Sequence, residues 1–119
     1  MAIEKALVTL LKPYVSNRVY PATLPENPVY PCITYYTLSH LANKIVNVQY
    51  PTFAIDLWTD TAQANVELRD TIVDGCDRKW STTDGYAMRF NYLTYRNFYD
   101  TETKKFHGVI DAELLYKEV

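Results

Sequence analysis

Glycine is scarce in this 119-residue chain, which contains three glycines in total. Loops that cradle phosphate groups and the sharp turn that carries the nucleophile of many hydrolases both depend on glycine, because the backbone there must approach closely or turn tightly. The patterns GxxxxGK[ST], GxGxxG and GxSxG do not occur in the sequence. These absences argue against an enzyme without excluding one.

Cysteine is equally rare, and the two present, Cys32 and Cys76, lie far apart and match no CxxC spacing. Small disulfide-stabilised domains carry several cysteines at short spacings. We therefore expect two reduced thiols. His40 and His107 have no second ligand three or four positions away, so the sequence predicts no metal site, no cofactor and no catalytic residue.

The chain also has no concentrated excess of positive charge, because the 12 Lys and Arg residues are spread along it and the net charge is −2. Tight binding of nucleic acid requires a basic stripe that neutralises phosphates. No long apolar run is present either, since residues 1–11 (MAIEKALVTLL) are too short and carry an acidic residue. We expect a soluble, unsecreted protein that neither enters a membrane nor binds DNA tightly.

Hydrophobic periodicity predicts the elements of one domain spanning residues 1–119. The expected helices cover 3–11, ended by Pro13, and 61–76, with Asp60 opening a capping box. The connections are a stiff proline-rich segment at 14–31, a loop or strand extension at 39–48 and a loop at 77–85. The expected strands are 32–38, 49–59, 86–99 and 104–118.

This order, α-β-β-α-β-β, predicts an α+β fold. We expect a mostly antiparallel sheet of four or more strands with both helices on one face. The last strand alternates, and its core face is predicted to carry Phe106, Ile110, Ala112, Leu114 and Tyr116.

The opposite face of the predicted sheet is more apolar than a face given wholly to water needs. Four residues are therefore candidates for a self-assembly interface, although scattered surface hydrophobes are the plainer alternative. Three acidic residues are candidates for an acidic or channel-lining face. The interface candidates are Leu93, Tyr95, Val109 and Leu115, and the acidic candidates are Asp56, Asp111 and Glu113.

Residues 39–48 contain no glycine or proline turn signal. The apolar residues there are interrupted by polar ones, which suggests a segment that orders against a neighbour. The candidates for such an assembly loop are Asn43, Lys44, Ile45, Val46 and Asn47.

One motif points to an enzyme. Asp84 followed by Glu102 and Lys104 formally resembles the acid-then-E-x-K pattern of a metal-dependent nuclease superfamily. Such a site needs its E-x-K on a core strand, whereas residues 100–106 read as a polar hairpin turn. We interpret the match as chance and keep the nuclease as an alternative of a different class.

Several segments together resemble the tail-completion, or tail-terminator-like, proteins of long-tailed phages. These are ALVTLLKPYV, RVYPATLPENPVYPCITYY, FAIDLWTDTAQANVELRDTIVDG and FYDTETKKFHGVIDAELLY, which together span nearly the whole chain. The most specific pieces are residues 18–21, residues 55–58 and Tyr99–Asp100. The chain departs from the family at 39–48, where a glycine-containing turn is typical.

The resemblance implies an α+β protomer in a homo-oligomeric ring that ends the tail tube, and the ring number that it implies is six. It implies the tail tube protein and a head-side connector or stopper as partners, while genomic DNA passes through without specific binding. It also implies a place at the head–tail junction of the virion, with the host cytoplasm as the site of assembly. A neck adaptor or stopper on the head side of the same junction is the alternative.

Overall fold

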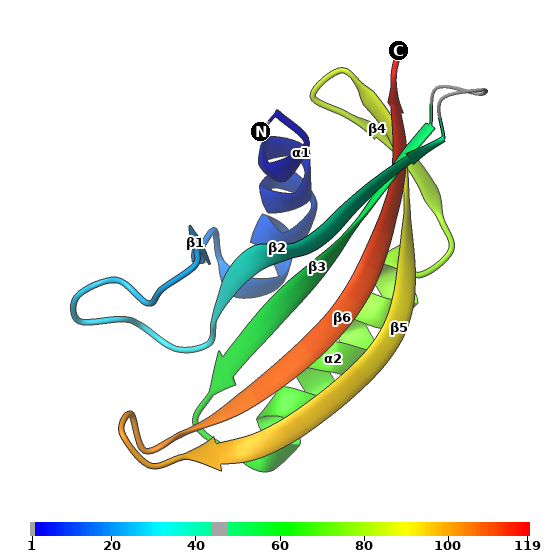
Figure 1. Ribbon diagram of the computed structural model, residues 1–119. Helices are drawn as coiled ribbons and strands as arrows, with labels where there is room; N and C mark the ends of the chain where they lie inside the picture. Colours follow the sequence, from blue (N-terminus) through cyan, green and yellow to red (C-terminus); the bar gives the residue numbers. More distant parts are fainter. Residues whose placement is uncertain (1, 44–47) are drawn as a thin grey trace.

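The computed structural model describes residues 2–43 and 48–119, which form one six-stranded sheet with two α-helices on the same side of it (Figure 1). The strand order across the sheet is β1-β2-β3-β6-β5-β4, and every neighbouring pair is antiparallel except β1 and β2. The elements are α1 (Ala2–Leu11), the 3-10 helix η1 (Lys12–Val15), β1 (Val19–Pro21), β2 (Cys32–Asn43), β3 (Val48–Thr59), α2 (Ala62–Cys76), β4 (Trp80–Thr83), β5 (Tyr86–Asp100) and β6 (Lys105–Glu118).

The α+β class and the two helices on one face are confirmed, but the predicted order α-β-β-α-β-β is wrong because it omits two short edge strands. β1 ends at Pro21, and proline, which has no N–H to donate, is tolerated at such an edge. β4 forms a hairpin with β5 through Asp84 and Gly85, whose φ angles of 51° and 83° fit a two-residue turn with two left-handed positions.

The core lies between the helices and the sheet. Every second residue of β3 and β6 faces it, as the alternation predicted, and α1 adds its apolar stripe. The side chains buried there include Ile3, Leu7 and Leu11 from α1, Ile33 from β2, Phe53, Ile55 and Leu57 from β3, and Ile110, Ala112 and Leu114 from β6.

Helix α2 is held on the sheet by a polar side chain. Asn65 is completely buried, and its side-chain amide donates to the carbonyl oxygens of Leu57 at 2.8 Å and Phe106 at 3.2 Å. The Asn65 Oδ1 atom accepts from the Tyr95 hydroxyl at 2.7 Å. A Cβ atom at Gly108 would lie 1.8 Å from this Oδ1, so only glycine permits the approach.

The N-terminus of α2 is capped by Thr61 and not, as predicted, by Asp60. The Thr61 hydroxyl accepts from the backbone N–H of Ala64 at 3.0 Å, as an N-cap side chain does. Asp60 instead forms an ion pair with Lys105. The N-cap therefore lies one residue after the position predicted from the sequence.

Both cysteines are free and buried. At the end of α2, the Cys76 sulfur lies 3.4 Å from the Tyr14 hydroxyl, and Gly75 gives this ring its space. Neither helix in the described part of the chain is long and apolar enough to cross a membrane.

Candidate functional site

The sheet face opposite the helices is hollowed at one end. We call this hollow, of about 560 Å³, the open-face groove. Because Ile33, Ile55 and Ile110 point into the core, the residues next to them on each strand point to the groove side. Its floor is formed by Thr34 and Tyr36 of β2, Asp56 and Trp58 of β3, His107 and Val109 of β6, and Arg96 and Phe98 of β5, and its rim by residues 22–24, Asp100, Glu102 and Thr103.

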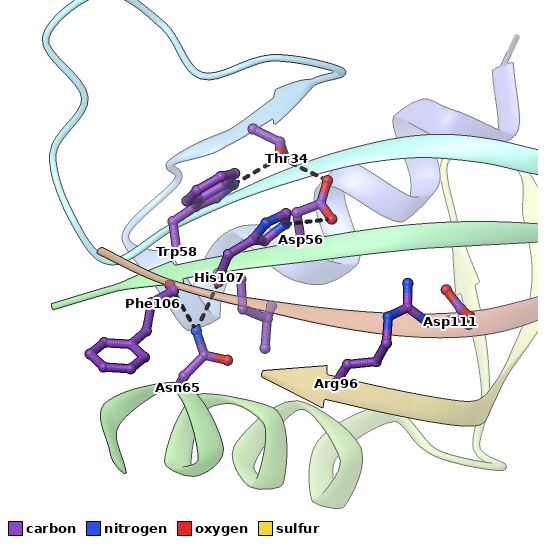
Figure 2. Close-up of polar contacts among 9 residues, drawn as sticks. Thr34, Asp56, Trp58, Asn65, Arg96, Phe106, His107 and Asp111 are labelled. Carbon is purple, nitrogen blue, oxygen red and sulfur yellow. Dashed lines mark hydrogen bonds and ion pairs between the residues drawn. The ribbon is translucent and has the colours of Figure 1, made fainter. Parts of the chain in front are cut away.

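A hydrogen-bonded network crosses three strands at the floor of the groove (Figure 2). The Trp58 indole N–H donates to the Thr34 hydroxyl at 3.0 Å, and this hydroxyl donates to Asp56 Oδ2 at 3.2 Å. The other carboxylate oxygen of Asp56 lies 2.9 Å from His107 Nε2. Asp56 is 5% exposed, and these partners offset the loss of its hydration.

Aromatic rings fix the orientation of His107. The Trp58 ring stacks on the imidazole with 4.0 Å between centroids and 11° between planes. Phe98 covers another side of the imidazole at 4.7 Å. The imidazole is therefore held by packing as well as by its bond to Asp56.

The charged groups around the floor are less constrained. Arg96, whose side chain is largely exposed, lies 3.6 Å from Asp111 Oδ2, and Figure 2 shows this pair beside the network. At the rim, Asp100 accepts from the Thr103 hydroxyl at 2.6 Å and from the Thr103 backbone N–H at 2.9 Å. These bonds hold the pKa of the Asp100 carboxyl below its ordinary value, and the bond from the Thr103 hydroxyl has the larger effect on that pKa.

The four interface candidates do not form one surface. Leu93, 51% exposed, lies at a β-bulge where the pairing with β6 shifts between Tyr92 and Thr94. After the bulge, the odd-numbered residues of β5 face the helices instead of the open side. Tyr95 therefore packs against α2, and the prediction that it lies on the open face is wrong. Val109 is on the open face but only 5% exposed, whereas Leu115 is partly exposed.

The three acidic candidates do share the open face, as the register between β3 and β6 shows. They are not a uniformly solvated cluster, however, because Asp56 is buried in the network. Asp111 accepts from the Thr94 hydroxyl at 3.1 Å, and Glu113 lies 3.4 Å from the Asn91 amide. Their role in lining a channel stays a prediction.

The part of the segment 39–48 that the structure describes is strand. β2 continues to Asn43 and β3 begins at Val48, so the strand-extension alternative is right for these positions. Ser39 follows a second bulge, at Leu38. The other candidates for the assembly loop, Lys44, Ile45, Val46 and Asn47, lie outside the described residues.

The nuclease candidates are not brought together. Asp84 lies in the turn before β5, where it accepts from the Thr9 hydroxyl at 2.8 Å, and Glu102 and Lys104 lie in the turn after it. β5 has 15 residues, so at ~3.3 Å per residue a strand with a contour length of about 45 Å separates the two turns. No group of three His, Cys, Asp or Glu side chains suited to a metal ion occurs within residues 2–43 and 48–119.

Sequence reasoning missed the groove itself. Asp56 and Trp58 alternate with core residues, and His107 lies on the matching face of β6, so the alternation placed all three on one side. The signal that could have found the network was the register, in which Trp58 pairs with His107 and Asp56 with Thr34. Pairing partners are not visible in a single sequence.

Comparisons with known proteins identify a fold and no family. No protein-family model matches the sequence, and no curated protein matches it. Among solved structures, a chain described as part of the virion of a native gene transfer agent (GTA) particle matches 97% of this chain and 94% of its own length. The TM-score is 0.72 at 12% sequence identity. The two chains share one fold.

Proposed function

We propose that the protein is a structural component of a phage-like virion, where it forms a ring at the end of the tail tube, stops tail polymerisation and joins tail to head. The observation that carries the proposal is the shared fold with a chain of a virion particle, which extends over nearly all of both chains. The resemblance of four segments to tail-completion proteins narrows this role to the tail end.

The open face supports assembly with other proteins. It leaves large apolar side chains exposed that the protomer does not cover, including Tyr36 at 44% and Phe98 at 46%. Exposed aromatic residues are enriched at protein interfaces. A ring of identical, head-to-tail contacts would cover such residues in every copy and would also bury free sheet edges.

The charge distribution suits a ring through which DNA slides. The net charge is −2, and Asp111 and Glu113 add acidic groups to the open face. Without a basic stripe, few phosphates are neutralised and the ring does not hold the DNA. The partners in this proposal are further copies, the tail tube protein and a head-side connector or stopper.

Electron microscopy of the purified protein tests the proposal. Negative-stain images and mass photometry should show monomers or weak oligomers in dilute solution, and hexameric rings on the ends of tail tubes. Protein that stays monomeric even with tubes would overturn the ring. Binding to the head-side connector without binding to tubes would move the protein to the other side of the junction.

The same proposal assigns no catalytic activity to the protein. Incubation with DNA and magnesium or manganese should leave the DNA intact, because Asp84 and Glu102 lie at opposite ends of β5. Cleavage that disappears in Glu102→Ala would contradict the structural role and restore the nuclease alternative.

A further inference from the structure

The open-face groove has an excess of negative charge. Three carboxylates line it, those of Asp56, Asp100 and Glu102, against the single guanidinium of Arg96. Three negative charges minus one positive charge leave a formal charge of −2 when His107 is neutral. An anionic ligand would be repelled there, whereas a cation would be attracted.

The groove also offers aromatic surface beside these charges. Tyr36 and Phe98 line it and are each nearly half exposed, while Trp58 and His107 form a stacked pair at the floor. A cation over an aromatic ring face is stabilised by the ring quadrupole. Arginine combines such stacking with forked hydrogen bonds to carboxylates, which the ammonium group of lysine does not provide.

Glu102 is the carboxylate best placed to meet a ligand. It is exposed in the β5–β6 turn, and none of the residues that the structure describes bonds to its carboxylate. Asp56 is engaged by Thr34 and His107, and Asp100 by Thr103, so both contribute mainly charge. The groove is large enough for a side chain with its flanking backbone.

We infer that the open-face groove binds an arginine side chain presented by an extended segment of a partner protein. The guanidinium lies against the exposed ring of Phe98 and pairs with Glu102 at the same end of the groove, while Arg96 opposes its entry. The inference does not depend on the proposed ring, because the groove is complete within one protomer.

Short peptides test the inference on the full-length protein. The probe is a capped Gly-Arg-Gly peptide, and its control is the same peptide with citrulline, which has the same shape without the charge. Two-dimensional NMR should show saturable shifts of the Trp58 indole N–H and the Phe98 amide at millimolar peptide. The citrulline peptide should bind at least tenfold more weakly, and added salt should weaken the arginine peptide.

Two substitutions of exposed groove residues should act in opposite directions. Glu102→Gln should weaken binding several-fold, because it removes the partner carboxylate, and Arg96→Gln should strengthen it, because it removes the opposing charge. Glu118→Gln, an exposed acid at the far end of β6, is the matched control and should change nothing.

Three results would overturn the inference. They are equal binding of the arginine and citrulline peptides, a change of the same sign in Glu102→Gln and Arg96→Gln, and stronger binding of an acidic peptide or a short DNA strand at the Trp58 signal. None of these bears on ring formation, which the tail-tube images test separately.

Discussion

Each face of the sheet buries polar side chains, and the two faces support them in different ways. On the helix side, a buried polar side chain, Asn65, fits against Gly108 with no space left over. On the open side, the buried Asp56 and the partly buried His107 are supported by aromatic rings and lie at the floor of a groove. The first arrangement serves the fold alone, whereas the second leaves exposed surface that a partner can cover. The helix side should therefore tolerate substitution less than the open side.

Gly108→Ala should have the largest effect. Its Cβ would lie 1.8 Å from Asn65 Oδ1 and 2.9 Å from Tyr95, so Asn65 must leave its place and its hydrogen bonds are lost. We expect the free energy of unfolding to fall by about 3 kcal/mol. Urea unfolding followed by circular dichroism measures it.

Gly85→Ala is the control for this prediction. Gly85 has a φ of 83° with open space around it, so the substitution meets backbone strain alone and should lower the free energy of unfolding by about 1 kcal/mol. Equal effects of the two substitutions would show that close packing at Asn65 does not hold α2 in place.

Breaking the open-face network should lower the free energy of unfolding by less than Gly108→Ala does, and a second substitution should restore part of the loss. Asp56→Ala leaves His107 Nε2 without its partner and should lower the free energy of unfolding by about 2 kcal/mol. His107→Phe keeps an aromatic ring between Trp58 and Phe98 but leaves the Asp56 carboxylate under-satisfied, at a similar cost.

The double substitution Asp56→Ala/His107→Phe decides whether the two side chains act as a pair. It should be at least about 1 kcal/mol less destabilising than the sum of the single substitutions, because neither partner remains unsatisfied. Additive losses would mean that the bond between them contributes nothing beyond packing.

Alkaline pH should lower the free energy of unfolding through one group on each side of the sheet. Burial raises the pKa of the Cys32 thiol, on the open-face side of β2, from 9.0 to about 11. On the helix side, the contact with Cys76 and, second, burial raise the pKa of the Tyr14 hydroxyl from 10.0 to about 12. The folded state keeps these protons while the unfolded state releases them, so stability is fully present below about pH 9 and falls as pH rises from there to about 12.

Urea unfolding at pH 7, 9, 10 and 11 measures this loss. Cys32→Ala should flatten the decline between pH 9 and 11 and leave the Tyr14 contribution above pH 10. A variant as pH-dependent as the natural sequence would show that Cys32 titrates equally in both states.

Local patterns in the sequence predicted most of the fold. Alternation in residues 49–59 and 104–118 placed both central strands and their core faces, and helical spacing gave both helices. The hairpin through Asp84–Gly85 was missed although an Asp-Gly pair between strand-like runs is a strong hairpin signal. β1 was missed because three residues ending in proline carry almost no pattern of their own.

The site was predicted less well, because it depends on register. The single extra residue at Leu93 reverses which side chains of β5 face the helices, and this misplaced Tyr95. Val109 lies on the expected face, but the surrounding side chains already cover it. Alternation gives a residue its face, whereas burial depends on neighbours that only the folded sheet brings together.

Leu93→Asp should have the smallest effect on the protomer and a decisive one on assembly. Leu93 is 51% exposed at a bulge, so a carboxylate there stays hydrated, and the free energy of unfolding should change by less than about 0.5 kcal/mol. In a ring that covers the position, the same carboxylate would be buried without a partner. We therefore expect unchanged circular dichroism and urea unfolding, with loss of rings on tail tubes. Val29→Asp, at an exposed position in the loop before β2, is the matched control and should still form rings. Normal assembly of Leu93→Asp would remove this bulge from the interface, and a large loss of protomer stability would mean that Leu93, like the residues on the helix side, serves the fold.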